Sequence, residues 1–135
     1  MINLQIIEYN PKYNEQIKNL LVELQEYITS IDKEGYNITT KSFRELYFQK
    51  TIEEINNCNG KILLASQNKE IIGLIIGIIN NEEENTYNFK VPKRGRITEL
   101  IVSQKYRTSG IGQKLLNKME EYLKNIGCKA ILIEC

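Results

Sequence analysis

The stretch "ELIVSQKYRTSGIGQKLLNKMEEYL", residues 99–123, decides the fold of this chain. An apolar run ends at Val102, seven mostly polar residues follow, and Gly110 and Gly112 then flank an isoleucine at the start of a helical pattern. The first amides of a helix lack partners inside the helix, and the helix dipole adds positive charge, so this end binds anions. Glycine has no β-carbon, which lets a diphosphate approach the backbone closely. The simpler alternative is that Gly110 only permits a tight turn and Ser109 caps the helix.

Two well-known phosphate-binding patterns fit the glycine turn incompletely. A Walker P-loop requires a lysine directly after a glycine, and Lys114 does not occupy that position. The Rossmann pattern G-x-G-x-x-G has Leu115 in place of its third glycine, although Glu134, about 20 residues further on, mimics the ribose-binding acid of that fold. A Rossmann turn follows its strand almost at once, whereas residues 103–109 intervene here. The spacing therefore argues against a dinucleotide site.

The rest of the chain divides into strands and helices by its apolar periodicity. The expected strands are residues 3–9, 61–66, 70–79, 96–103 and 129–135, and the expected helices are residues 13–31, 43–55 and 111–126. Gly73 and Gly77 indicate a bulge or a close approach by another backbone, and Gly127 is placed to end the last helix. The second and third strands have hairpin spacing, whereas the last two enclose a helix and favour a parallel crossover. The order β-α-α-β-β-β-α-β predicts an α/β fold of the α+β kind, with a mixed sheet.

Composition excludes several classes of function. The 135 residues fit one domain, and 18 Lys and Arg against 17 Asp and Glu give no basic excess of the kind that nucleic-acid binders show. The longest apolar run, residues 71–79, is too short to span a membrane. Three scattered cysteines and no recognisable leader favour the cytoplasm. The absence of histidine excludes histidine bases and histidine metal sites, so we expect no metal.

A third phosphate-binding pattern, [QR]-x-x-G-x-[GA], matches "RTSGIG", residues 107–112, and here the chain resembles the GNAT superfamily of N-acetyltransferases. The segment "ITELIVSQKYRTSGIGQKLLNKMEEYLKNIGCKAILIEC" is similar to the family's central strand, pyrophosphate loop, helix and following strand. The upstream elements also appear in the family's order. The resemblance implies a single acetyltransferase domain over residues 1–135, with acetyl-CoA as co-substrate.

The same resemblance assigns residues to the binding of acetyl-CoA. Pyrophosphate binding falls on Arg107, Thr108, Ser109, Gly110, Ile111 and Gly112. In the family the central strand bulges away from the next strand, and the pantetheine arm pairs with its backbone, here at Leu100, Ile101 and Val102. The backbone amide of Leu100 or Ile101 is then expected to polarise the thioester carbonyl and stabilise the oxyanion.

The implied reaction is direct attack of an amine on the thioester of acetyl-CoA. An amine is protonated at neutral pH, and Glu99 is our candidate for the base that removes the proton, directly or through water. Some relatives carry an acidic pair at this point, and Thr98 replaces one of its members. The alternative is that Glu99 is a strand-end carboxylate paired with a nearby Lys or Arg.

The C-terminus departs from the family pattern. The family domain normally continues into another helix and two more strands, whereas this chain ends at Cys135. The explanations left open are a shortened piece, a naturally short form, and a homodimer that completes the sheet through the open edge of residues 130–135. Cys135 is either a nucleophile or an inert buried thiol. The alternative functions are a non-catalytic or partner-completed acyl-CoA-binding module and, less favoured, a Rossmann-type dinucleotide-binding protein.

The acceptor is expected to be a small-molecule or peptide amine. Residues 28–48 and the segment before the central strand shape the acceptor site in the family. Candidate lining residues are Tyr27, Glu34, Tyr36 and Tyr47. The acidic turn at residues 82–84 is either a solvated turn or the rim of a site for a cationic acceptor.

Overall fold

The computed structural model describes residues 4–80, 93–107 and 109–133. Within these ranges the chain forms five strands and three α-helices in the expected order. They are β1 Leu4–Glu8, α1 Asn14–Ile31, α2 Phe43–Asn57, β2 Lys61–Gln67, β3 Glu70–Asn80, β4 Arg94–Val102, α3 Ile111–Asn125 and β5 Ala130–Ile133. Short 3-10 turns, Pro11–Tyr13 and Gln104–Tyr106, precede α1 and follow β4. The predicted mixed α/β fold is thereby confirmed.

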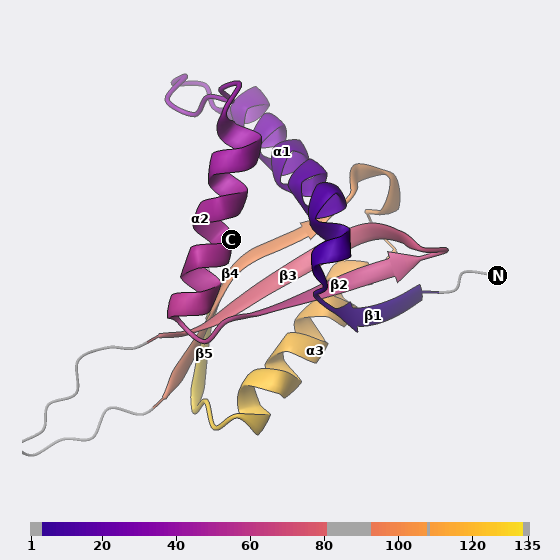
Figure 1. Cartoon of the computed structure of the whole chain (residues 1–135), viewed down its shortest axis with the longest axis vertical. Helices are drawn as coiled ribbons and strands as arrows, with labels where there is room; N and C mark the ends of the chain where they lie inside the picture. The colour runs from indigo at the N-terminus through magenta and orange to yellow at the C-terminus, as the bar shows by residue number, and fades with distance from the viewer. Residues whose placement is uncertain (1–3, 81–92, 108, 134–135) are drawn as a thin grey trace, which may run out of the picture.

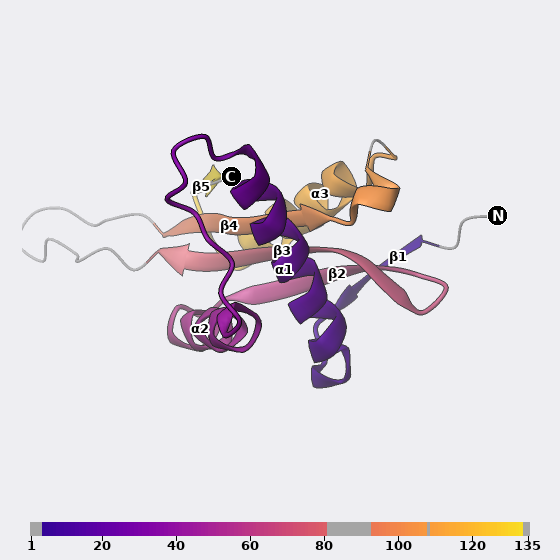
Figure 2. The same ribbon diagram turned by 90° about the horizontal axis from the view of Figure 1, so that it is seen from above.

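The strands form one mixed sheet in the order β1-β2-β3-β4-β5. Each of the pairs β1–β2, β2–β3 and β3–β4 is antiparallel, and β5 is parallel to β4. Helices α1 and α2 lie on one face of the sheet, and α3 lies on the other (Figures 1 and 2). A Rossmann sheet is mostly parallel, so this topology excludes the dinucleotide-binding alternative.

Both faces of the sheet are buried by the apolar stripes that the sequence predicts. On α3, Leu115, Met119 and Leu123 repeat at four-residue steps and are completely buried against the sheet. On the other face α1 buries Ile17 and Leu20. In contrast, α2 contains no fully buried residue. Helix α2 is thus the least enclosed of the three described helices, which leaves polar side chains on it free to line a site.

The two strand glycines lie beside a bulge and at close approaches of other groups, although the extra residue of the bulge next to Gly77 belongs to β4 and not to β3. The register between β3 and β4 shifts between Ile76 and Gly77, which is a β-bulge. A β-carbon added at Gly73 would lie 3.0 Å from the backbone oxygen of Ile101, which is the expected close approach of another backbone. At Gly77 the approaching group is a side chain instead, because an added β-carbon would lie 2.7 Å from Met119 Sδ.

Replacing Gly77 by alanine is therefore expected to destabilise the fold by about 1–3 kcal/mol, the usual cost of overpacking a core. Met119 is completely buried and has little room to move aside. Urea unfolding monitored by circular dichroism measures the change. Combining Gly77→Ala with Met119→Ala removes the clash, so the double variant should lose less stability than the two single changes added together. Full additivity would contradict this explanation.

The C-terminal part of the structure matches the expected helix and strand. Gly127 has φ of +99° directly after α3, which is the left-handed conformation expected of a helix-ending glycine. On β5, Leu132 and Ile133 are about half exposed, and the homodimer stays a prediction. Residues 134 and 135, and with them the interpretations of Glu134 and Cys135, lie outside the described residues, as does the acidic turn at residues 82–84. Among the helices that the structure describes, none is long and apolar enough to cross a membrane.

Candidate active site

The bulge in β4 lies where the sequence places the candidate base. Glu99 is paired with Ile76 and Ile97 is paired with Gly77, so Thr98 is the extra residue. In such a bulge, two residues of one strand stand opposite a single residue of its partner, and the bulged strand bends at this point. Thr98 and Glu99 consequently line the same cavity, together with Arg96.

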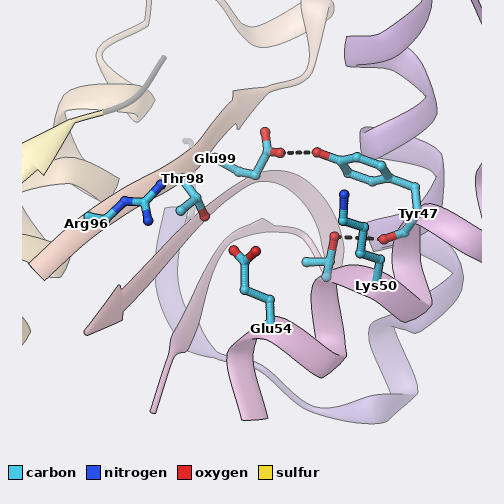
Figure 3. A pocket seen from close by; sticks show the side chains of 7 residues that line it. Tyr47, Lys50, Glu54, Arg96, Thr98 and Glu99 are labelled. Carbon is cyan, nitrogen blue, oxygen red and sulfur yellow. Dashed lines mark hydrogen bonds between the residues drawn. The ribbon is translucent and has the colours of Figure 1, made fainter. Parts of the chain in front are cut away.

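The cavity has a volume of about 200 Å³ and lies between β4 and α2 (Figure 3). Its lining residues are Tyr47, Lys50, Thr51 and Glu54 from α2 and Arg96, Thr98 and Glu99 from β4. Every one of these side chains carries a polar or charged group, and none is aliphatic. The cavity can therefore accept a small molecule through hydrogen bonds and charge.

Glu99 is partly buried, and the tyrosine hydroxyl of Tyr47 donates a hydrogen bond to its Oε1 (Figure 3). Burial raises the pKa of the Glu99 carboxyl above its usual range, and the charge of Glu54 raises it further, whereas the hydrogen bond from Tyr47 acts in the opposite direction. A carboxylate with a raised pKa takes up a proton more readily near neutral pH. The environment of Glu99 suits a general base.

Tyr47 is fixed in place by two contacts within its own helix. Its ring stacks on that of Phe43, with the ring centroids 4.9 Å apart. The hydroxyl of Thr51 donates to the backbone oxygen of Tyr47 at 2.8 Å. Burial, followed by the hydrogen bond to Glu99, raises the pKa of the Tyr47 hydroxyl, so Tyr47 keeps its proton.

The glycine turn leaves the first amides of α3 accessible. Gly110 occupies the N-cap position with φ of +81°, and no side chain caps the helix. The hydroxyl of Ser109 donates instead to the backbone oxygen of Tyr106, so the alternative that Ser109 caps the helix is wrong. A β-carbon at Gly110 would meet nothing within 4 Å, and one at Gly112 would first meet Val102 at 3.7 Å. Packing therefore does not explain why residue 112 is glycine.

Arg107 directly follows the 3-10 turn Gln104–Tyr106, beside the glycine turn. Its Nε donates to the backbone oxygen of Val102 at 3.2 Å, and its guanidinium carbon lies 5.2 Å from the ring centroid of Tyr27. The side chain is exposed, so its remaining donors face solvent close to the start of α3. Thr108, the neighbouring residue of the predicted loop, lies outside the described residues.

The backbone of β4 distinguishes between Leu100 and Ile101. The amide of Ser103 donates to Ile72 in β3 at 2.7 Å, so Ser103 faces β3. Backbone groups of an antiparallel strand face alternate sides from one residue to the next. The amide of Ile101 therefore also faces β3, whereas that of Leu100 faces the β5 side. In the described residues the β4–β5 pairing runs only from Arg94 to Ile97.

The structure brings together some of the predicted acceptor-site residues and not others. Tyr47 lines the cavity with Glu99, but Glu34 and Tyr36 are exposed residues of the loop after α1, and Tyr27 packs on Arg107. Sequence reasoning did not identify Lys50, Thr51 and Glu54. A signal was present, because residues 47, 50, 51 and 54 share one face of a helix at three- and four-residue steps.

The family model that matches this chain is the acetyltransferase (GNAT) family, over residues 26–135. The chain belongs to the GNAT family of acetyltransferases. It is thus an N-acetyltransferase, as the sequence predicts. Among the described residues of this GNAT protein, no group of three or more His, Cys, Asp or Glu side chains is arranged to hold a metal ion.

Individual relatives of this GNAT protein are distant. A glucosamine 6-phosphate N-acetyltransferase from Arabidopsis thaliana is 22% identical over 101 residues, which cover 75% of this chain and 68% of the relative. Among solved structures, a Bacillus halodurans protein crystallised as a tetramutant has a TM-score of 0.80 at 15% identity, covering 97% of this chain and 82% of that one. An aminoglycoside N-acetyltransferase in complex with CoA has a TM-score of 0.71 at 12% identity, covering 100% of this chain and 78% of that one. At these identities the structures support the fold alone.

Proposed function

We propose that this protein transfers the acetyl group of acetyl-CoA to the primary amine of a small polar acceptor by direct attack. The observation that carries the proposal is the position of Glu99, a partly buried carboxylate directly after the β4 bulge. It lines a cavity in which every lining side chain carries a polar or charged group. Family membership supplies the class of reaction. The position of Glu99 supports its assignment as the base in this reaction.

Acetyl-CoA is proposed to bind along β4 and at the start of α3. The amides of residues 109–112, with Thr108 and Arg107, would bind the pyrophosphate, because these amides lack helical partners and carry the positive end of the helix dipole. The pantetheine arm would pair with the backbone of β4 at Leu100 and Val102, whose polar groups face away from β3. Leu100 is then favoured over Ile101 as the amide that donates to the thioester oxygen.

In the proposed reaction the acceptor enters the cavity as an ammonium ion. Glu99 takes one proton from it, directly or through a water molecule, and leaves a neutral amine. The amine nitrogen then forms a bond to the thioester carbonyl carbon, and the Leu100 amide stabilises the negative charge on the oxygen. The C–S bond then breaks and its electron pair leaves with the CoA sulfur. The second proton on the attacking nitrogen is lost through water to the CoA thiolate, so the products are the neutral amide and the CoA thiol.

The lining of the cavity supports a hydrophilic acceptor. Hydroxyl groups of Thr51 and Thr98, together with charged groups of both signs, fit an acceptor rich in hydroxyl or ionic groups better than an aliphatic amine. The activity named for the Arabidopsis relative makes glucosamine 6-phosphate a reasonable first probe.

We expect acetyl-CoA to be consumed in the presence of at least one hydrophilic amine. The assay follows CoA thiol release with glucosamine 6-phosphate, glucosamine, spermidine, lysine and the apolar control hexylamine. The polar cavity predicts faster turnover of an amino sugar than of hexylamine. Titration calorimetry measures the binding of acetyl-CoA to the same protein in parallel. Binding of acetyl-CoA without turnover of any amine would contradict the proposal and favour the non-catalytic binding module.

A further inference from the structure

The contact between Tyr47 and Glu99 joins α2 to β4 across the cavity, between residues 52 positions apart in the sequence. We propose that Tyr47 is a positioning residue, whose hydroxyl orients the Glu99 carboxylate toward the cavity and stabilises its negative charge. The inference rests on the proposed function, in which Glu99 is the base. It assigns to α2 a part in the chemistry beyond shaping the acceptor site.

Geometry supports this role because Tyr47 cannot easily turn away from Glu99. Its ring is held by the stack on Phe43, one helical turn earlier on α2. The hydroxyl is therefore presented to β4 at a fixed place (Figure 3). On the other side the bulge at Thr98 sets the direction of the Glu99 side chain. Tyr47 is thus positioned by a ring stack and Glu99 by a strand bulge, both of which are present without substrate.

Electrostatics explains why Glu99 requires such a donor. Burial and the negative charge of Glu54 both favour the protonated carboxyl, which cannot accept a proton from the acceptor. The hydrogen bond from Tyr47 favours the ionised form. The other charged groups that line the cavity are Lys50 on α2 and Arg96 on β4. Since the hydroxyl of Tyr47 keeps its own proton, Tyr47 acts as a hydrogen-bond donor and does not replace Glu99 as the base.

The test is the titration of Glu99 by NMR in protein labelled with carbon-13 at the glutamate carboxyl, with Glu99→Gln identifying the resonance. Without the Tyr47 hydroxyl, burial and Glu54 act unopposed, so Tyr47→Phe should raise the pKa of Glu99 by about one pH unit. Tyr36→Phe, which removes a hydroxyl from a residue 82% exposed, should leave it unchanged. An unchanged or lowered Glu99 pKa in Tyr47→Phe would overturn the inference.

A second measurement needs no substitution at Tyr47. In wild-type protein labelled at the tyrosine ζ-carbon, one tyrosine resonance should shift with the same midpoint as Glu99, and Glu99→Gln should abolish this shift. Absence of a coupled tyrosine resonance would also overturn the inference. Failure of the proposed function would give a different result. Glu99→Gln would then leave acetyl transfer intact, while the wild-type protein would still show the shared titration midpoint of Glu99 and a tyrosine. Failure of the inference alone would leave Glu99→Gln inactive and the Glu99 pKa insensitive to Tyr47→Phe.

Discussion

Replacing Glu99 by glutamine is expected to lower kcat/KM for acetyl transfer by about 10²- to 10⁴-fold, the usual contribution of a positioned general base. Glutamine keeps the shape of the side chain and can still accept a hydrogen bond from Tyr47, but it cannot take a proton from the acceptor ammonium. Initial rates of thiol release with a saturating amine from the panel measure the loss. Affinity for acetyl-CoA should stay within about twofold, because none of the proposed cofactor contacts involves the Glu99 side chain.

Glu54→Gln is the matched control, because it makes the same chemical change in the same cavity. Glu54 raises the pKa of Glu99, so removing its charge should lower that pKa. The acidic limb of the kcat/KM profile, where activity falls as Glu99 becomes protonated, should then move to lower pH, with a rate loss near neutral pH of less than about tenfold. Equal losses in the two variants would contradict the assignment of Glu99 as the base. A Glu99→Gln enzyme with wild-type activity would exclude it.

Local patterns in the sequence were sufficient to predict the structural elements on which the proposed acetyl-CoA site lies. The strand, the polar span, the glycine turn and the helix are contiguous, and each is specified by periodicity or by a glycine conformation. Gly110 has the left-handed φ that only the backbone freedom of glycine makes inexpensive. The capping alternative for Ser109 failed because its hydroxyl had a nearer acceptor in the preceding turn.

The cavity between α2 and β4, which we propose as the acceptor site, was predicted less completely, because it depends on how two distant elements pack. Tyr47 was among the candidates, but its partnership with Glu99 spans 52 positions and arises only when α2 lies over β4. Lys50, Thr51 and Glu54 have the composition of an ordinary solvated helix face. The family resemblance implies a bulge in the central strand around residues 100–102, whereas the extra residue is Thr98. Tertiary packing determined these features.

Replacing Gly112 by alanine is expected to weaken acetyl-CoA binding by roughly tenfold to a hundredfold, the equivalent of losing one charge-assisted hydrogen bond. The added methyl group would project toward Val102, at the junction of β4 and the turn where the pyrophosphate is proposed to lie. It would keep the phosphate from approaching the backbone amides. The fold itself should not suffer: the nearest atom is at ordinary contact distance, and alanine favours a helix by up to about 1 kcal/mol over glycine.

Stability and binding together distinguish a glycine that is required for ligand binding from one that is required for the fold. Substitution of the first kind weakens binding and leaves stability unchanged or higher, whereas substitution of the second kind lowers stability. Calorimetry gives the acetyl-CoA affinity and urea unfolding gives the stability of the same variant. The control is Gln113→Ala, at the next position of α3, where the side chain is exposed. It should change neither the acetyl-CoA affinity nor the free energy of unfolding by much. Unchanged affinity in Gly112→Ala would remove the turn from the proposed cofactor site. A clear loss of stability would instead show that the fold requires the glycine. The protein has room for the added methyl group, so the proposal expects this group to affect only the bound ligand.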